Sequence, residues 1–588
     1  ERTTHEDARL LQPRIFHRGW CRHFSSDRVI SIAANAWAWR QLLAHKPQPA
    51  KASTARDGRS AWSHDIGREP CFATTSNCPG DFTDVNHTCA RGNVPDDPGN
   101  VTAQVERLAL RDRNHASVLW YSLCNEFGCG PGTLLKNYTA QKCYDAMHAV
   151  DCSRAITDNM GWQTSSTADV SSGTPISILF DVMGVSHQQS SVFDAWHKAE
   201  PSKLIVATEC CSCTTQRGED TDLLPARSST TAPFVYNSNE NSDCVSEQTQ
   251  RSNQLSFVGG TFVWTCHDYL GEPSQNSQGQ VWPHVSSSFG SFDLAGFPKA
   301  PVWWYRSWWL AAVSDKDAGR PPLATSKTAT FCRLVESWQP SLFSSGRNLT
   351  VYTNAAAVQI YVNDEAASDV VYMSPFGAAK FASVQYASGR VTARCMSASG
   401  AVLAMHTKNS FSKPVAIKLS VDAPSVRTGT GERVYLDGQD VTLVRATVVD
   451  ADGFTVHTSM NNISFAVTNG PARLIGVGNG DPANQDPNHA SWRPAYHGLV
   501  RAIFQVTLYA AGTAADRELI MAVNKEAGAG PLCSQVATGQ QSQPTSFTVT
   551  AHSNGLLSDS LTIPLSSDES DSPLHVAEMS VPLADIGE

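Results

Sequence analysis

The chain has 588 residues, of which 41% are hydrophobic, and a formal net charge of −10. This length predicts three or four domains, and the apolar content is sufficient for real cores. The acidic balance leaves no basic stripe to neutralise phosphates, so a nucleic-acid partner is not expected. No apolar run reaches the ~18 residues that a membrane-spanning helix needs, so no membrane partner is expected either.

The first part of the chain is irregular and is followed by a barrel-like pattern. Residues 1–80 have no clean period, and we expect only early barrel elements there. Residues 81–315 alternate strands and helices, which is typical of a parallel sheet. The strands are expected at 82–86, 117–126, 154–159, 176–185, 203–209 and 258–265, and an amphipathic helix at 134–150. We therefore expect a (β/α)8 barrel of the TIM type, whose first two strands would have to come from residues 1–75.

Two of these strands end on a glutamate. The runs are SVLWYSLCNE, ending at Glu126, and KLIVATE, ending at Glu209. A single glutamate after a strand is more often a solvated loop residue. Two of them at the carboxyl ends of barrel strands lie where such barrels place their chemistry. A pair of carboxyl groups across a bond is the equipment for hydrolysing a glycosidic linkage.

The surrounding residues resemble glycoside hydrolase family 2, which contains β-galactosidases, β-mannosidases and β-glucuronidases. LRDRNHASVLWYSLCNE, residues 110–126, resembles the acid/base signature of that family, with Ala116 where proline is usual. KLIVATECCSCTTQRGED resembles the nucleophile strand, with Cys210 at a position that is commonly tyrosine. VGGTFVWTCHDYLGEP resembles the last barrel strand, and FPKAPVWWYRSWW resembles the segment that leaves the barrel.

The resemblance implies a retaining exo-β-glycosidase that works by double displacement. Glu209 would be the nucleophile and Glu126 the acid and base, with the carboxyl groups about 5–5.5 Å apart. Burial and the negative charge of Glu209 would raise the pKa of Glu126. Asn125 would bind the sugar 2-hydroxyl, and Trp264 would form the floor on which the sugar ring stacks.

Three further substrate contacts follow from the resemblance. Asp268 and His87 are candidates for binding sugar hydroxyls. His87 ends a D-V-N-H element that resembles the D-E-N-H of the family, although Val85 replaces the acid. His187 stands where the family often has a tyrosine that contacts the nucleophile. The changes at Val85 and His187 favour the rival hypothesis of a catalytically impaired carbohydrate-binding fragment, which the retention of both glutamates disfavours.

The substrate is expected to be a terminal β-galactoside, or another glycoside or oligosaccharide, because β-galactosidase is the commonest activity for this domain order. β-Mannosides are the alternative within the family. A β-glucuronide is less expected, because the sequence has no N-x-K motif to bind the sugar carboxylate. No metal or other cofactor is expected, and a ligand set for the magnesium that some β-galactosidases use is not evident. A homo-oligomer is a possible assembly.

The second half of the chain predicts β-sandwiches. Short strands separated by turn residues are expected at 349–354, 358–363, 415–422, 442–450, 463–467, 499–508 and 546–552. We assign residues 325–412 to an immunoglobulin-like sandwich, 413–566 to a C-terminal sandwich and 567–588 to an acidic tail. We expect the chain to lack the jelly-roll and immunoglobulin-like domains that usually precede the barrel in this family.

The cysteines and sequons predict a secreted protein or one of a lysosome- or vacuole-like compartment. Most of the 16 cysteines precede residue 300. Cys210, Cys211 and Cys213 could form a zinc cluster, but zinc sites usually use C-x2-C pairs, so disulfides or buried thiols are favoured. The disulfide connectivity cannot be deduced from the sequence. Glycosylation sequons occur at Asn86, Asn100, Asn137, Asn348 and Asn462.

Overall fold

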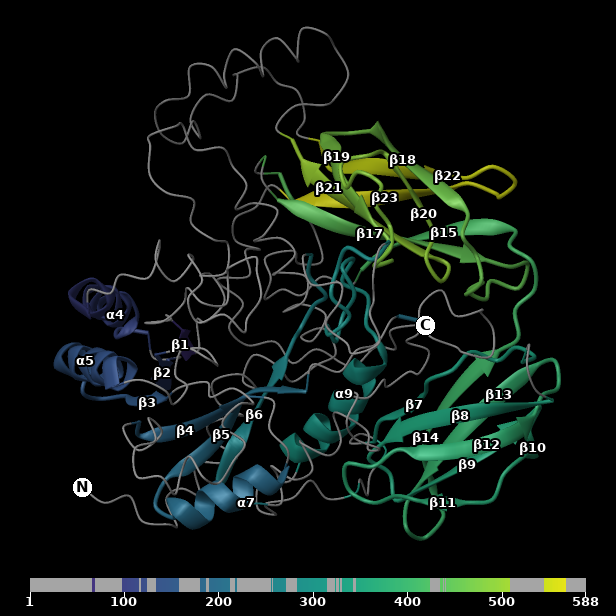
Figure 1. Cartoon of the computed structure of the whole chain (residues 1–588). Helices are drawn as coiled ribbons and strands as arrows, with labels where there is room; N and C mark the ends of the chain where they lie inside the picture. Colours follow the sequence, from purple (N-terminus) through teal and green to yellow (C-terminus); the bar gives the residue numbers. More distant parts are fainter. Residues whose placement is uncertain are drawn as a thin grey trace, which may run out of the picture.

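The computed structural model shows an α/β part followed by two β-sandwiches (Figure 1). It describes residues 66–68, 98–115, 118–123, 134–157, 180–186, 190–211, 217–218, 255, 257–270, 283–314, 323, 327, 330–341, 345–422, 434–436, 438, 440–507 and 544–566. Among these residues, no helix is long and apolar enough to cross a membrane.

The described strands of the α/β part form two parallel sheets. One has the order β1 (Ile66–Arg68), β2 (Trp120–Ser122), β3 (Ala155–Thr157), and the other β4 (Val182–Ser186), β5 (Leu204–Cys211), β6 (Val258–Trp264). Every strand pair within them is parallel. The helices are α4 (Pro98–Asp112), α5 (Leu134–Val150), α7 (Ser190–Ala199) and α9 (Ala300–Ser314). This alternation of parallel strands and helices confirms the predicted barrel class.

Alternate strand residues divide this part into an inner and an outer layer. The inner layer joins strands from both sheets, with Trp120, Val182 and Val206 packed together and with Phe262 edge-on to Trp120. The outer layer faces the helices: Tyr121 packs with residues of α4 and α5. Inner-layer and outer-layer residues alternate because successive side chains of a strand point to opposite faces of the sheet.

The strand positions agree well with the sequence, with two differences. The helix at 134–150 and the strands expected at 154–159, 203–209 and 258–265 are confirmed, although β5 continues to Cys211, and β4 overlaps the end of the strand expected at 176–185. The acid strand is shorter than expected, with three paired residues, Trp120–Ser122. The described neighbour of this strand is β1 at 66–68, in the region where only early barrel elements were expected. The expected strand at 82–86 lies outside the described residues.

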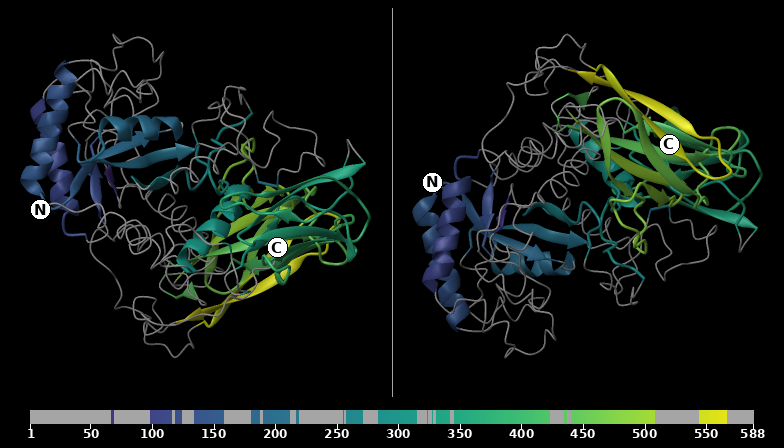
Figure 2. Two further views of the ribbon diagram at one scale, coloured as in Figure 1. Left: turned by 90° about the horizontal axis from the view of Figure 1, so that it is seen from below. Right: turned by 90° about the horizontal axis from the view of Figure 1, so that it is seen from above.

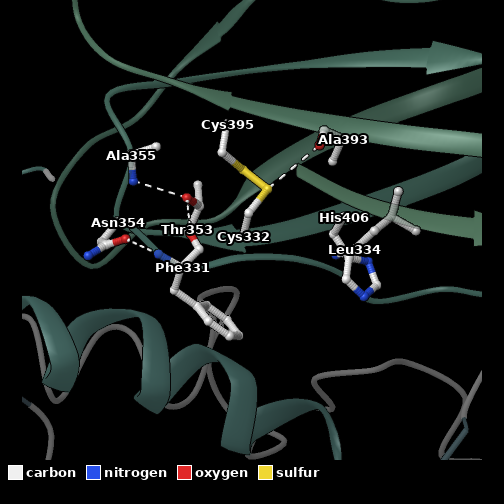
Figure 3. The surroundings of a disulfide bond; sticks show 9 residues. All are labelled: Phe331, Cys332, Leu334, Thr353, Asn354, Ala355, Ala393, Cys395 and His406. Carbon is white, nitrogen blue, oxygen red and sulfur yellow. Dashed lines mark hydrogen bonds between the residues drawn. A yellow bond between two sulfur atoms is a disulfide. The ribbon is translucent and has the colours of Figure 1, made fainter. Parts of the chain in front are cut away.

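The first sandwich follows the long helix α9. One sheet has the order β12 (Ala379–Gln385), β8 (Gly346–Thr353), β7 (Cys332–Leu334). The other has the order β10 (Glu365–Ala366), β9 (Ala357–Val362), β13 (Arg390–Met396), β14 (Val402–Asn409), with β11 (Val371–Tyr372) also paired to β9. A disulfide between Cys332 and Cys395 joins the two sheets (Figure 3). The core of this sandwich is continuous with the outer layer of β4, β5 and β6.

The C-terminal sandwich has its own core. One sheet has the order β15 (Ala416–Val421), β17 (Val441–Val449), β21 (Leu499–Val506), β19 (Ala472–Gly478). The other has the order β16 (Val434–Tyr435), β23 (Asp559–Ser566), β22 (Ser546–His552), β18 (Asn462–Asn469), β20 (Trp492–Pro494). Residues of both sheets, such as Phe504 and Phe547, are fully buried between them. Figure 2 shows α4 and α5 at the opposite end of the molecule from the sandwiches.

Candidate active site

Glu209 lies near the carboxyl end of β5 and is 7% exposed. Strand β5 is the middle strand of its sheet, between β4 and β6. A buried carboxylate at this end of a central parallel strand is where an α/β barrel carries its chemistry. The structure therefore places Glu209 where the strand-end pattern predicted it.

A β-bulge decides which way Glu209 faces. Ile205 and Ala207 belong to the outer layer, so strict alternation would send Glu209 outward as well. The register, however, pairs Val185 with Ala207 and the next position, Ser186, with Glu209. Thr208 is thus one extra residue, and its hydroxyl donates to the Val185 carbonyl at 3.3 Å.

The extra residue restores Glu209 to the inner face. Val182 is an inner residue of β4, and Val185 is an outer one. The strand position that follows Val185 is therefore on the inner side, and Glu209 is paired with it. Bulges commonly re-aim a side chain next to an active site in this manner. We infer from the register that the Glu209 carboxylate faces the barrel interior.

Trp264 ends the neighbouring strand β6, in register with Cys211 of β5. Its indole Nε1 donates to the Tyr269 hydroxyl at 3.3 Å, and the two rings meet edge-on with centroids 5.9 Å apart. Tyr269 in turn lies 6.3 Å, between ring centroids, from the buried Phe289. The indole is half-buried, so part of its surface is accessible at the strand end. An aromatic surface fixed in this way suits stacking on a sugar ring.

The Asp268 side chain is buried and is hydrogen-bonded by other groups of the protein. It is 4% exposed, and the Lys299 ammonium donates to both of its carboxylate oxygens, at 2.9 and 3.1 Å. The Gly290 amide donates to one of the same oxygens at 2.8 Å. Burial raises the pKa of Asp268 to about 7, against the opposing effect of Lys299. The Asp268 carboxylate is therefore already hydrogen-bonded to Lys299 and Gly290, and its contact with a sugar hydroxyl stays a prediction.

The other predicted site residues lie outside the described part of the chain. They are Glu126, Asn125, His87 and His187. Described residues end at Leu123 on the acid strand and at Ser186 on β4, so Glu126 follows β2 and His187 directly follows β4. Their roles, and the distance between the two carboxyl groups, stay predictions.

Two contacts of the α/β part were missed by the sequence reasoning. Tyr121 of β2 donates to Asp151 Oδ2 at 2.8 Å. Arg217, eight positions after Glu209, is 6% exposed and pairs with Asp293 at 2.5 Å between Nε and Oδ2. The sequence separations are 30 and 76 residues, and no local pattern joins such partners. The only sequence signals for these contacts were a polar residue, Tyr121, within an apolar strand and a charged residue, Arg217, shortly after a strand end.

Within the described residues, no group of three or more histidine, cysteine, aspartate or glutamate side chains could hold a metal ion. Cys210 and Cys211 belong to β5, and their side chains, like Cys213, lie outside what is described. In the described part of the chain, Cys332 and Cys395 form a disulfide, and the free cysteines are Cys152 and Cys266.

Comparison with known proteins identifies two domains of one family. Residues 75–226 match the TIM barrel domain of glycosyl hydrolases family 2. Residues 428–515 match C-terminal domain 5 of glycoside hydrolase family 2. The first match contains the sheet position of Glu209, and the second covers most of the C-terminal sandwich.

Individual relatives are distant. The β-galactosidase BoGH2A of Bacteroides ovatus is 25% identical over 447 residues, which are 67% of this chain and 47% of that protein. A β-glucuronidase of Formosa agariphila is 26% identical over 234 residues, 37% of this chain and 21% of that protein. A solved β-glycosidase from Bacteroides vulgatus has a TM-score of 0.57 at 20% identity and covers 81% of this chain and 55% of that one.

A solved family 2 member from Bacteroides cellulosilyticus has a TM-score of 0.56 at 17% identity, with 79% of this chain and 52% of that chain covered. At these identities the likeness shows the fold. The chain spans about half the length of the first curated relative and of these two structures.

Proposed function

Because this chain belongs to glycoside hydrolase family 2, we propose that it is a retaining exo-β-glycosidase acting on terminal β-galactosides. The observation that carries this proposal is the bulge of β5, which turns the buried Glu209 to the inner face beside the end of β6. A nucleophile must reach the anomeric carbon of a sugar held at the barrel mouth, and an outward-facing carboxylate could not do so.

The proposed reaction has two displacements. The Glu209 carboxylate attacks the anomeric carbon while Glu126 protonates the oxygen of the leaving group, which breaks the glycosidic bond. Glu126, now ionised, then removes a proton from water, and the water oxygen displaces Glu209 and releases the sugar with its original configuration. Asn125 binds the 2-hydroxyl, and Trp264 supplies the apolar floor.

The choice of β-galactosides rests on the family and its relatives. The β-galactosidase of Bacteroides ovatus shares the longer similar region with this chain. A β-glucuronidase shares a shorter one. β-Mannosides, β-glucosides and β-glucuronides are therefore the alternatives to be compared with galactosides in the same assay.

The proposal is tested by the hydrolysis of aryl β-glycosides of these four sugars. One sugar should be turned over, and Glu209→Gln should reduce that rate by about 10⁴-fold or more, because a nucleophile is removed. The matched control is Glu200→Gln, in the turn between α7 and the amino end of β5, where the Glu200 carbonyl accepts from the Lys203 amide. This variant should keep nearly full activity. A folded protein that turns over none of the sugars would support the carbohydrate-binding alternative.

Azide separates the roles of the two glutamates. In Glu209→Ala, azide can attack the anomeric carbon in place of the missing carboxylate and give the α-glycosyl azide. In Glu126→Ala, azide instead displaces Glu209 from the glycosyl-enzyme and gives the β-glycosyl azide. The opposite products would show that the two assignments are exchanged.

A further inference from the structure

Arg217 links the loop after the nucleophile strand to the C-terminal sandwich. Its Nε donates to Asp293 at 2.5 Å, and its Nη2 donates to the carbonyl of Asn479 at 2.5 Å. The guanidinium carbon lies 4.9 Å from the ring centroid of Phe297 and 5.1 Å from that of Tyr496. A charge that is only 6% exposed therefore has an ionic partner, a carbonyl and two aromatic faces.

These partners come from two different parts of the chain. Asp293 and Phe297 belong to residues 283–299, here called the bridging segment, which connects the end of the barrel to α9. Asn479 and Tyr496 belong to residues 479–498 of the C-terminal sandwich, in the loops that flank β20. Arg217 is thus the point at which three separate segments meet.

The bridging segment also holds the loop that carries Trp264. The amides of Ser291 and Phe292 donate to the carbonyls of Thr265 and Cys266 at 2.9 and 2.8 Å. Lys299 and Asp268 add the buried ion pair between the same two segments. The loop after β6 is therefore hydrogen-bonded to the bridging segment, whose Asp293 accepts the hydrogen bond from Arg217.

The sandwich holds the bridging segment from the other side. The Val285 amide donates to the Pro482 carbonyl at 2.9 Å, and Arg501 Nη1 donates to the Ala295 carbonyl at 2.6 Å. The Arg501 guanidinium lies 4.3 Å from the same Phe297 ring that Arg217 approaches. Gly218, next to Arg217, is in direct contact with His497, since a Cβ there would lie 2.5 Å from the ring.

We propose that Arg217 is a positioning residue, which fastens the loops after β5 and β6 to the C-terminal sandwich and so makes that sandwich part of the catalytic unit. The inference rests on the proposed glycosidase function for its kinetic consequence. Arg217 acts on the reaction through the placement of Glu209 and Trp264 and needs no contact with the sugar. Small displacements of reacting groups cost much in turnover, so the loss should be in kcat more than in KM.

The test compares Arg217→Ala and Arg217→Lys with Arg154→Ala. Arg154 is a matched control, because it also pairs with a buried aspartate, Asp151, at 2.6 Å and donates to two backbone carbonyls. It lies, however, at the amino ends of β2 and β3, away from the strand ends that carry the site. Arg217→Ala should lower kcat by about 10- to 100-fold with a smaller change in KM.

Arg217→Lys should recover only part of the kcat, because an ammonium cannot make the same forked pair of hydrogen bonds. Arg154→Ala should lower thermal stability and leave kcat of the folded protein unchanged. An unchanged kcat in Arg217→Ala, or an equal loss in Arg154→Ala, would overturn the positioning role.

Amide hydrogen exchange provides a readout that does not depend on turnover. Exchange of the amides of Val285, Ser291 and Phe292 should become faster in Arg217→Ala and stay unchanged in Arg154→Ala. If the wild-type protein hydrolyses no glycoside but this exchange pattern is seen, the docking is supported and the proposed function fails. If exchange is unchanged in Arg217→Ala, the docking itself is refuted, whatever the activity.

Discussion

Asp151, directly after α5, ties that helix to β2. Its carboxylate accepts hydrogen bonds from Tyr121 of β2 at 2.8 Å, from Arg154 at 2.6 Å and from the Ser153 hydroxyl at 2.6 Å. Burial would raise the pKa of Asp151, but the hydrogen bonds from Ser153, Tyr121 and Arg154 outweigh it and lower the pKa to about 2. The ionised form is therefore the one that the folded protein stabilises.

Asp151→Asn should consequently lower the free energy of unfolding by an amount that depends on pH. A folded-state pKa below the unfolded value of about 4 contributes stability that is present above pH 4 and is lost as the pH falls towards 2. The shift corresponds to about 2 kcal/mol at neutral pH. The thermal midpoint of Asp151→Asn should lie below that of the wild type at pH 7, and the gap should close between pH 4 and 2.

The control for this prediction is Asp145→Asn on the exposed side of the same helix, where the carboxylate accepts from Gln141 alone at 2.9 Å in the described contacts. Its midpoint should stay close to that of the wild type across this range. A gap for Asp151→Asn that does not depend on pH would contradict the assignment of the ionised form.

At the residue scale, the sequence predicts strand-end positions better than partners. The position of Glu209 follows from an apolar run that stops on a carboxylate, whereas Trp264 was expected at its strand end because VGGTFVWTCHDYLGEP resembles the last barrel strand of the family. The ion pair of Asp268 with Lys299 joins residues 31 positions apart and depends on how the loop after β6 folds back. That distance in sequence is why Asp268 was predicted as a substrate contact and its buried partner was not predicted.

The β5 strand shows what a bulge does to an element. A pattern of alternating residues can identify β5 as a strand, but strict alternation puts Glu209 on the outer face, in the layer of Ile205 and Ala207. The bulge at Thr208 changes that result by one residue. Because a bulge is set by pairing with the neighbouring strand, the sequence of β5 alone could not predict it.

The sandwich strands illustrate the same limit. Strands β8 and β17 are mostly buried, and β9 and β22 alternate between buried and partly buried residues; all four were predicted within a few residues. Strand β12 was not predicted, and its register is broken between Phe381 and Val384. Strand β14 was not predicted either, because most of its residues are only partly buried and leave little pattern. Period-two reasoning succeeds where one face is cleanly buried and unbroken.

The disulfide of the first sandwich is a second element-scale feature that the sequence could not predict. Cys332 of β7 and Cys395 of β13 lie in different sheets, and hydrogen bonds among Phe331, Thr353 and Asn354 hold the backbone beside the bond (Figure 3). The sequence offered 16 cysteines without a connectivity. The fold selects this pair by bringing the ends of two strands together across the core.

Removing this disulfide should destabilise the sandwich strongly. The bond closes a loop of 63 residues, for which the chain-entropy account gives about 4 kcal/mol. The double variant Cys332→Ala/Cys395→Ala should therefore have a lower thermal midpoint than the wild type. A reductant should lower the wild-type midpoint by more than that of the double variant, which keeps the disulfide of Cys143. Cys152→Ala, which removes an exposed free thiol, should respond to the reductant as the wild type does.

At the scale of the whole molecule, two kinds of contact join the domains. The first sandwich shares an apolar core with the barrel, in which Trp304 and Trp308 of α9 are buried between the sheet and the sandwich. The C-terminal sandwich instead meets the barrel through charged and backbone groups around Arg217 and Arg501. A shared apolar core holds domains rigidly, whereas a polar contact of this kind can be released by a single change.

Gly480 is the position at which such a change is best tested. It has a φ of +79°, and a Cβ there would lie 1.9 Å from Asp293 Oδ2. That aspartate cannot readily move aside, because it accepts from Arg217 and from the amides of Ala295 and Phe297. Gly480→Ala should therefore separate the sandwich from the barrel, and a tryptic digest should release the C-terminal sandwich faster than from the wild type.

Gly453 provides the matched control for Gly480. It lies in a turn of the same sandwich with a φ of +84°, and a Cβ there would meet nothing within 4 Å. Gly453→Ala has the same backbone penalty of about 1 kcal/mol, but it adds no contact with Asp293. If the two variants release the sandwich at equal rates, the backbone penalty alone explains the effect. If only Gly480→Ala accelerates release, and lowers glycoside turnover with it, the contact with Asp293 is what unites the sandwich and the barrel in one catalytic unit.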